Sequence, residues 1–231
     1  MATNREVFDR IADSWYGFRH WPLLRRELEE LATRWSGGHI VNLGCGHGAD
    51  FIPFSSGFRL TGLDFSRGML RQGRAYMEKH HLEAELVQAD LRALPFRDGS
   101  FDHAVAVASY HHLDGEEARR RAFAELHRVL RPNGEVFLSV WRNPRGAAAA
   151  GPEDGLVSWN SGGEVLQRYY HFFTPEELAS MLYDSGFTVL RLEPDVRPSG
   201  GAAAGRGNLC VIARRDQGTP AHVKAGWEAH G

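Results

Sequence analysis

Three glycines stand at every second position, at Gly44, Gly46 and Gly48, directly after an apolar run that ends at Leu43. Glycine lets the backbone turn tightly and approach a ligand closely. The next apolar run ends at Asp64, and an acidic residue about 20 positions after the first glycine can accept hydrogen bonds from ribose hydroxyls. The spacing therefore predicts a nucleoside-binding site at the carboxyl edge of a parallel sheet.

The glycines alone leave the nucleotide open, because Gly44-x-Gly46-x-x-Ala49 also fits the loose dinucleotide fingerprint. A nicotinamide or flavin enzyme therefore stays an alternative. Three further segments bear on the choice: Asp90, placed after the third predicted strand to meet an adenine amino group; the turn 94–102, which leads into the fourth; and residues 125–135, a helix that ends on Pro132-x-Gly134 before the fifth.

The elements that must position these residues alternate in type, which predicts an α/β protein with a doubly wound, mostly parallel sheet and helices on both faces. We expect helices over 4–17, 22–35, 66–79, 116–130 and 174–185, and seven strands over 39–43, 58–63, 84–88, 102–108, 135–141, 187–193 and 208–213. Thr174, Pro175 and Glu177 have the form of a capping box at the start of the last helix.

This pattern divides the chain into three parts. Residues 1–37 form an N-terminal helical segment near the substrate, and 38–215 form the main domain. Residues 143–163 are rich in Gly, Ala, Pro and Ser and are expected to be a mobile loop near the site, 197–207 a turn, and 216–231 a flexible tail.

Composition sets limits on function. A formal net charge of −2 excludes a globally basic nucleic-acid binder but not a local basic face, and 25 of the 27 basic residues are arginine. No apolar run approaches the length of a membrane span, and two distant cysteines suit a reducing compartment, so we expect a cytoplasmic location and no membrane contact. No cluster has metal-ligand spacing, so no metal is predicted.

Taken together, the glycine loop, the acidic residues and the two turn segments resemble the class I S-adenosylmethionine (SAM) methyltransferases over residues 38–141. The resemblance implies that the glycine loop contacts the methionine part of SAM, Asp64 the ribose, and Asp90 with Leu91 the adenine. The family usually has an acid where this chain has Asn42; Asp50 could replace that charge, or could only cap the short helix after the loop. The implied cofactor set is Asn42, Gly44, Gly46, Gly48, Asp50, Asp64, Phe65, Asp90, Leu91 and Ser109.

The flanking segments resemble the wobble-uridine tRNA methyltransferases, in the form of an archaeal-type member. The likeness lies in Ile11-Ala12 with Arg19-x-Trp21-Pro22, in His111-His112 after the fourth strand, and in Arg168-Tyr169-Tyr170-His171. It implies methylation of a carboxymethyl group on uridine 34 of tRNA, as the catalytic subunit of a heterodimer with a small zinc-binding activator protein.

Methylation of a carboxylate oxygen needs no general base, because the group is already ionised at neutral pH. The enzyme must hold the carboxylate in line with the methyl group and exclude water, and an arginine is its natural clamp. The candidate catalytic residues are Arg19, His112, Arg168, Tyr170 and His171.

Alternatives remain for several of these residues. Arg19 could pair with an acid on the N-terminal helices, and Tyr170 could be a packing aromatic. Arg119–Arg121 and Arg25-Arg26 could contact RNA phosphates or form solvated faces. Competing functions are a methyltransferase of a small metabolite or quinone, a nicotinamide oxidoreductase, and a non-catalytic adaptor that binds SAM.

Overall fold

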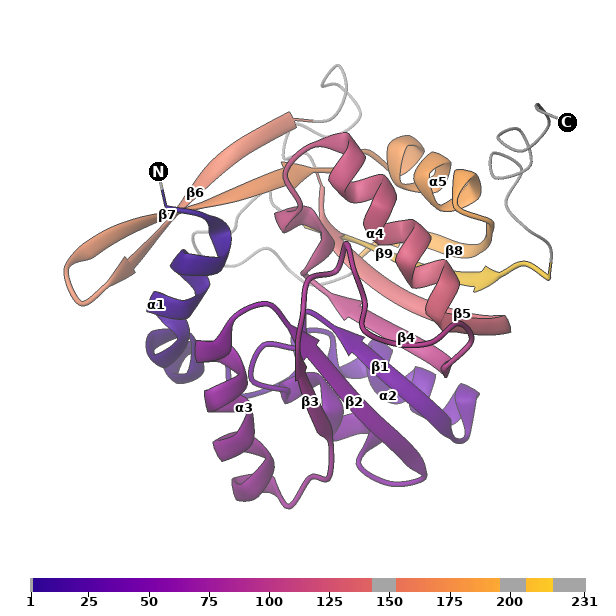
Figure 1. Cartoon of the computed structure of the whole chain (residues 1–231), viewed down its shortest axis with the longest axis horizontal. Helices are drawn as coiled ribbons and strands as arrows, with labels where there is room; N and C mark the ends of the chain where they lie inside the picture. Colours follow the sequence, from indigo (N-terminus) through magenta and orange to yellow (C-terminus); the bar gives the residue numbers. More distant parts are fainter. Residues whose placement is uncertain (1, 143–152, 196–206, 218–231) are drawn as a thin grey trace, which may run out of the picture.

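The computed structural model describes residues 2–142, 153–195 and 207–217 (Figure 1). Its seven-stranded sheet has the order β3-β2-β1-β4-β5-β9-β8, in which only β9 runs antiparallel to its neighbours. The strands are β1 (Gly38–Leu43), β2 (Phe58–Asp64), β3 (Glu85–Gln88), β4 (Phe101–Val107), β5 (Leu130–Trp141), β8 (Phe187–Pro194) and β9 (Asn208–Arg215). The predicted α/β fold with a seven-stranded, mostly parallel sheet is therefore confirmed.

Helices cover both faces of this sheet because side chains alternate along each strand. On β5, Val136 and Leu138 pack with α4 (Glu116–Val129) and α5 (Pro175–Asp184). Phe137, between them, packs on the other face with α2 (Arg25–Trp35), α3 (Arg67–His80) and the short helix η1 (Ala49–Phe54). The two buried clusters give the three-layer architecture that Rossmann-like proteins share.

Helix α1 (Asn4–Phe18) lies outside these layers, against α3 and beneath a two-stranded ribbon (Figure 1). The ribbon pairs β6 (Glu153–Ser161) with β7 (Glu164–Phe172) in antiparallel register. Buried side chains of α1, α3 and β7, among them Phe8, Met69 and Leu166, form a third apolar cluster.

The ribbon corrects the expectation of a mobile loop over 143–163, since residues 153–161 form a regular strand. The reason is the turn Gly162-Gly163, where both glycines have positive φ, +60° and +89°, as the two-residue turns that suit hairpins require. Residues 143–152, most of 197–207 and most of the expected tail lie outside the described residues.

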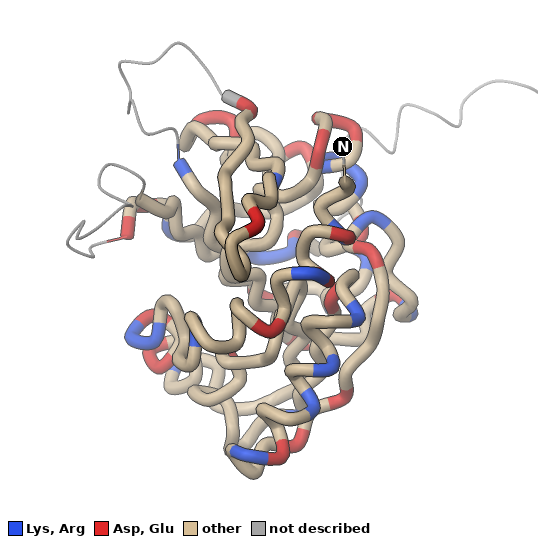
Figure 2. Tube along the Cα trace, turned by 90° about the vertical axis from the view of Figure 1, so that its left-hand side faces the viewer, with Lys and Arg blue, Asp and Glu red and all other residues tan. Residues whose placement is uncertain are grey.

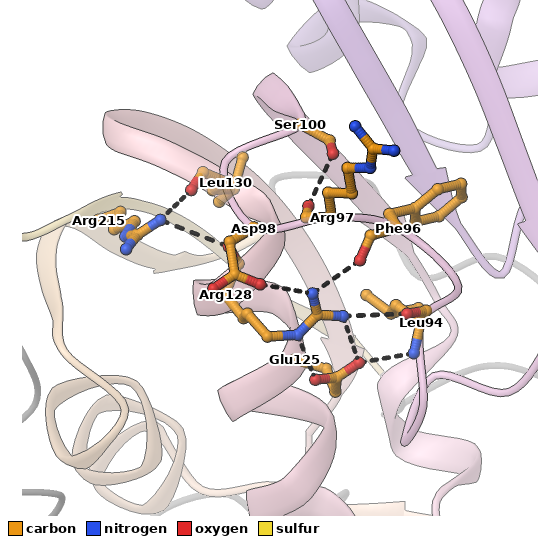
Figure 3. A network of polar contacts seen from close by, with 9 residues as sticks. All are labelled: Leu94, Phe96, Arg97, Asp98, Ser100, Glu125, Arg128, Leu130 and Arg215. Atoms are coloured by element: carbon orange, nitrogen blue, oxygen red, sulfur yellow. Dashed lines mark hydrogen bonds and ion pairs between the residues drawn. The ribbon is translucent and has the colours of Figure 1, made fainter.

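Two of the sequence segments singled out above are joined by one side chain, Arg128 of α4 (Figure 3). Its guanidinium donates to the carbonyl oxygens of Phe96 and Leu94, at 2.7 and 2.9 Å, and pairs with Asp98 at 2.9 Å. Glu125 in turn pairs with Arg128 and accepts the Leu94 backbone N–H at 2.6 Å. The turn 94–102 and the end of α4 thus form a structural network that holds the loop after β3.

Candidate functional site

A cavity of about 1120 Å³ opens at the carboxyl ends of β1, β2 and β4, where open α/β sheets bind ligands. It extends to α1 and to the β6–β7 ribbon. Of the predicted site residues, those on its wall are Arg19, Gly44, Gly46, Asp50, Asp64, Phe65, Asp90, Leu91, Ser109 and His112. Asn42, Gly48, Arg168, Tyr170 and His171 do not line it.

The glycine loop is held in shape by Asp64 and Ser109. The Gly46 N–H donates to Asp64 Oδ2 at 2.8 Å, and the Ser109 hydroxyl donates to the Leu43 carbonyl at 2.8 Å. Gly44 has φ +77°, and a Cβ there would collide with the Ser109 side chain. Glycine is therefore required at 44 by both conformation and space.

Asp64 is a buried carboxylate at the tip of β2. Burial raises the pKa of Asp64 to about 6, although the backbone N–H groups of Ser66 and Gly46 oppose the rise. Each of its oxygens accepts one of these bonds, the Ser66 N–H at 2.9 Å. The remaining lone pairs can accept from a ligand's hydroxyl groups.

Arg19 and Asp50 form an ion pair beside the glycine loop, with their nitrogen and oxygen 3.2 Å apart and side chains 14% and 7% exposed. The acid partner of Arg19 thus lies on η1 and not on the N-terminal helices. Asp50 makes no capping bond to η1; burial raises its pKa, and the Arg19 charge opposes that rise.

Unpaired polar atoms gather near this ion pair. Arg19 Nε and His47 Nε2 are buried without a hydrogen-bond partner, and both residues line the cavity. Burial lowers the pKa of His47 to about 4, so its ring is neutral at pH 7. Asn42, buried within β1, also leaves both amide atoms unpaired. Since buried polar atoms normally have partners, Arg19 and His47 fit a ligand that carries both donors and acceptors.

Asp90 lies at the opposite side of the glycine loop, after β3. Arg92 holds its carboxylate with two bonds, of 2.9 and 2.7 Å, and keeps the pKa of Asp90 below its usual value. Leu91 provides an apolar neighbour on the cavity wall. A flat heterocycle with an exocyclic amino group fits a surface of this kind.

Three distant segments meet on the remaining wall. The Asn4 side chain donates to the carbonyl oxygens of His112 and Tyr169, at 3.2 and 3.0 Å, and accepts the Tyr169 N–H at 2.8 Å. His112 Nδ1 donates to the same Tyr169 carbonyl at 3.1 Å. Helix α1, the short helix η2 (Tyr110–His112) and β7 are therefore locked together at the cavity.

The two adjacent histidines have different surroundings. Burial lowers the pKa of His112 to about 3, so its ring is neutral, with the proton on Nδ1 and Nε2 free to accept. His111 does not line the cavity; its Nδ1 accepts the Trp141 N–H at 3.1 Å and its ring stacks on Tyr170. Of the pair, only His112 is on the cavity wall.

Three predicted catalytic residues of β7 lie behind the wall. The Arg168 guanidinium packs against the rings of Trp159, Tyr170 and Trp15, with its carbon 5.0, 5.3 and 5.9 Å from their centres. No carboxylate of the described residues pairs with it, although the residue is only 4% exposed. Its partners among the described residues are the three aromatic rings and the polar side chain of Tyr170, so it is a buried positive charge without a carboxylate beside it there.

The other two have structural partners. Tyr170 is 2% exposed and packs on Trp141 with ring centres 4.5 Å apart. His171 lies between two acids, with Nδ1 2.7 Å from Asp154 and Nε2 2.9 Å from Glu177. These contacts join β7 to β6 and α5, and they explain why Glu177 does not complete the capping box at Thr174.

Most arginines suggested for phosphate contacts are already engaged. Arg119 is buried and donates to the Leu113 carbonyl, and Arg120 pairs with Glu116 and Asp184. Arg25 and Arg26 pair with the acids one turn further along α2. The solvated-face alternative therefore describes these helices better.

The sequence-based site set missed several wall residues, namely Asn4, Phe8, Trp15, His47 and Tyr169. Phe8 and Trp15 are seven positions apart, so they share one face of α1, and this spacing could have identified them. No spacing could have paired Asn4 with Tyr169, because the two are 165 positions apart.

Among the described residues, no three His, Cys, Asp or Glu side chains lie close enough to hold a metal ion. None of the helices described is both long and apolar enough to span a bilayer.

Comparison with known proteins supplies a family. Residues 40–134 match the model of a methyltransferase domain. A protein of Encephalitozoon cuniculi (strain GB-M1), named "putative methyltransferase", is 36% identical over 179 residues, covering 74% of this chain and 80% of that protein.

Two further relatives have more specific names. A tRNA (carboxymethyluridine(34)-5-O)-methyltransferase of Arabidopsis thaliana is 33% identical over 137 residues, 58% of this chain and 31% of its own length. The chain thus spans about a third of that relative. The O-methyltransferase resE of Aspergillus sclerotiorum is 29% identical over 189 residues, 76% of this chain and 65% of its own length.

Solved structures share the fold. The CcbJ methyltransferase of Streptomyces caelestis has a TM-score of 0.73 at 17% identity, covering 93% of this chain and all of that one. The [4+2]-cyclase SpnF has a TM-score of 0.71 at 18% identity, covering 93% and 95%. A cyclase among these neighbours shows that the fold alone does not determine the reaction.

Proposed function

The chain belongs to the class I SAM-dependent methyltransferases, and from this membership we propose that it methylates the carboxymethyl group of a modified wobble uridine in tRNA. Because the chain belongs to this family, SAM is the cofactor in place of the nicotinamide or flavin that the glycine spacing alone had left open. The substrate assignment is supported by the Arabidopsis relative and by the electrostatics of the cavity wall.

The residues at the glycine loop fit SAM. We assign the ribose hydroxyls to Asp64 and the adenine edge to Asp90 with Leu91. The zwitterionic methionine end suits the Arg19–Asp50 pair, which offers a cation and an anion beside two unpaired polar atoms. We therefore assign Arg19 to cofactor binding, whereas its sequence motif had suggested a contact with the methyl acceptor.

The observation that carries the substrate class is the buried charge of Arg168. Its field reaches the acceptor wall, since Arg168 adds to the lowering of the pKa of His112, a change that burial causes first. A buried cation without a carboxylate partner favours an anionic ligand nearby. The positive charge therefore stabilises a bound carboxylate acceptor but not a neutral one. We assign Arg168 the role of a positioning residue that acts on the acceptor through the cavity wall.

The chemistry then needs little from the protein. When bound, SAM would supply a methyl group on its sulfonium; as a carboxylate oxygen bonds to that methyl, the carbon–sulfur bond would break, which gives a methyl ester and leaves S-adenosylhomocysteine. The ring of His112 is neutral, so it can accept a hydrogen bond at Nε2. It carries no positive charge that would bind the acceptor carboxylate and draw it away from the methyl group. Trp15 and Phe8 exclude water from the wall.

A small-molecule O-methyltransferase is the second candidate. The Aspergillus relative, named only as an O-methyltransferase, matches more of this chain than the Arabidopsis relative does. The apolar wall residues Phe8, Leu156 and Leu166 would also suit a metabolite. In that case a neutral acceptor would react, and replacement of Arg168 would leave the reaction largely intact.

We also propose the activator partner that the family likeness implies. Its strand would pair with an edge of the sheet, β3 or β8, since these are the two outer strands. Co-expression of the chain with a small zinc-binding protein of that type, followed by size-exclusion chromatography, tests this. Separate elution of the two proteins would contradict it.

The deciding experiment measures transfer of labelled methyl from SAM to bulk tRNA, with and without the activator. Nucleosides are then identified by mass spectrometry, and mild alkali tests for an ester by releasing the label as methanol. An alkali-labile methyl on uridine 34 is the expected result. Bound SAM without any label in tRNA would favour the small-molecule candidate.

A further inference from the structure

One face of α3 carries arginines at Arg67, Arg71 and Arg74. Because a helix has 3.6 residues per turn, positions i, i+4 and i+7 lie within about 60° of one another. All three are exposed, while Met69, Gly73 and Tyr76 are buried on the opposite side of the helix. The three charges therefore form a single stripe, defined here as the α3 arginine stripe.

The stripe is poorly neutralised. Among the acids of the neighbouring α1, Asp9 is used by the Ser66 hydroxyl and the Gly68 N–H, at 2.7 and 2.8 Å. Asp13 reaches Arg71 at 3.5 Å, with both side chains largely exposed. Arg67 and Arg74 have no acid within ion-pair distance in the described part of the chain.

Acids do occur near the far end of the stripe. Glu78 lies one turn beyond Arg74 on the same face, yet the two form no ion pair. Glu78 lies in the last turn of α3, at the end of the helix away from the cavity. The positive charge is therefore concentrated toward the start of α3.

The start of α3 borders the cavity. Asp64 and Phe65 line the cavity just before the helix begins, and Met69 lines it from the first turn. The exposed Arg5 of α1 also lies on the cavity wall. Figure 2 looks onto the side where α1 and α3 lie, and basic positions follow one another down this face.

Elsewhere the exposed arginines of helices are mostly paired. Arg25 and Arg26 of α2 and Arg120 of α4 each bind a glutamate one turn away. Their helices therefore present nearly neutral surfaces. The α3 arginine stripe differs because Arg67 and Arg74 lack such partners among the described residues. It also lies on a helix whose opposite face, at Met69, borders the cavity.

We infer that the α3 arginine stripe is the surface on which the tRNA backbone docks, with Arg67 and Arg74 contacting phosphates while the target nucleoside enters the cavity. This rests on the proposed function. Arginine suits the role because its planar guanidinium binds phosphate oxygens in pairs. The stripe covers roughly 10 Å of helix axis, so it contacts more than one phosphate.

The test compares the double variants Arg67→Ala/Arg74→Ala and Arg25→Ala/Arg26→Ala by fluorescence anisotropy with labelled tRNA at several salt concentrations. The α3 variant should bind tRNA roughly tenfold more weakly at low salt, with a salt slope smaller by about two. Its KM for tRNA should rise with kcat nearly unchanged. The α2 variant should bind tRNA with wild-type affinity and salt slope. Both double variants should bind SAM with wild-type affinity.

A third variant separates charge from shape, since Arg67→Lys/Arg74→Lys should recover most of the affinity. Wild-type affinity and salt slope in the α3 alanine variant would overturn the inference. If the wild-type protein itself binds no tRNA at low salt, the proposed function fails first, and that result is visible before any variant is made.

Discussion

The guanidinium carbon of Arg168 lies 5.0 Å from the centre of the Trp159 ring, so a charge on β7 is packed against an aromatic ring on β6. Trp15 of α1 lies on the same guanidinium and also lines the cavity. The ribbon and α1 are thus joined by a cation that has no carboxylate partner among the described residues. One side chain therefore joins the ribbon to the cavity wall, and the proposed acceptor site depends on its charge.

Arg168→Met should reduce methyl transfer to a carboxylate acceptor on the order of tenfold, because the favourable field is lost. Arg168→Lys should retain more activity, since it keeps the charge. Both should lower the midpoint of thermal unfolding, because the cation–π contacts are weakened. Steady-state kinetics and thermal melts check this, with calorimetry to show that SAM affinity is unchanged. Equal activity in the two variants would mean that the charge is not used.

Arg19→Ala should weaken SAM binding at least tenfold and lower the free energy of unfolding by about 2–4 kcal/mol, because it leaves the buried Asp50 carboxylate uncompensated. Adding Asp50→Asn removes that charge. The double variant should therefore regain stability without regaining SAM affinity. Calorimetry and urea denaturation measure the two quantities separately. Recovery of SAM affinity in the double variant would remove the pair from the cofactor site.

SAM affinity should fall as the pH drops through about 6, since Asp64 is then protonated and accepts hydrogen bonds poorly. The folded-state pKa of Asp64 lies above its unfolded value, so its contribution to folding favours low pH and is lost as the pH rises through about 6. His47 and His112, with pKa values of about 4 and 3, stay neutral over this range. Calorimetry from pH 5 to pH 8 checks the change, which Asp64→Asn should abolish. An unchanged pH profile in that variant would assign the titration to another group.

Arg128→Ala should lower the free energy of unfolding by about 2–4 kcal/mol, because it removes charged hydrogen bonds to the turn after β3 and leaves Glu125 without its cation. Arg97→Ala, in the same turn but exposed, should change stability by less than about 0.5 kcal/mol. Urea denaturation compares the two. Equal effects would show that the network is not what holds the turn.

The main sheet could be predicted from local pattern because its inner strands β1, β2, β4, β5 and β9 contain runs of buried residues. Val136, Phe137 and Leu138 show how successive residues serve opposite layers, and such runs are strong strand signals. The ribbon was missed because β6 contains Gly, Ser and Asn, which have low strand propensity. Its stability comes from β7 and from α1, and the pair Gly162-Gly163 was the one local sign of a hairpin.

Local sequence determined the end of the site that we propose binds the cofactor. Gly44 and Asp64 are placed by the ends of two adjacent parallel strands, so their spacing along the chain was enough to bring them together. The acceptor end was decided only by tertiary structure. Arg19 pairs with Asp50, and Arg168 packs among aromatic rings instead of lining the cavity, because α1 packs beneath the ribbon. Such contacts depend on how whole elements pack, as where Trp15 of α1 lies against Arg168 of β7, more than 100 positions away, and no spacing within one segment encodes them.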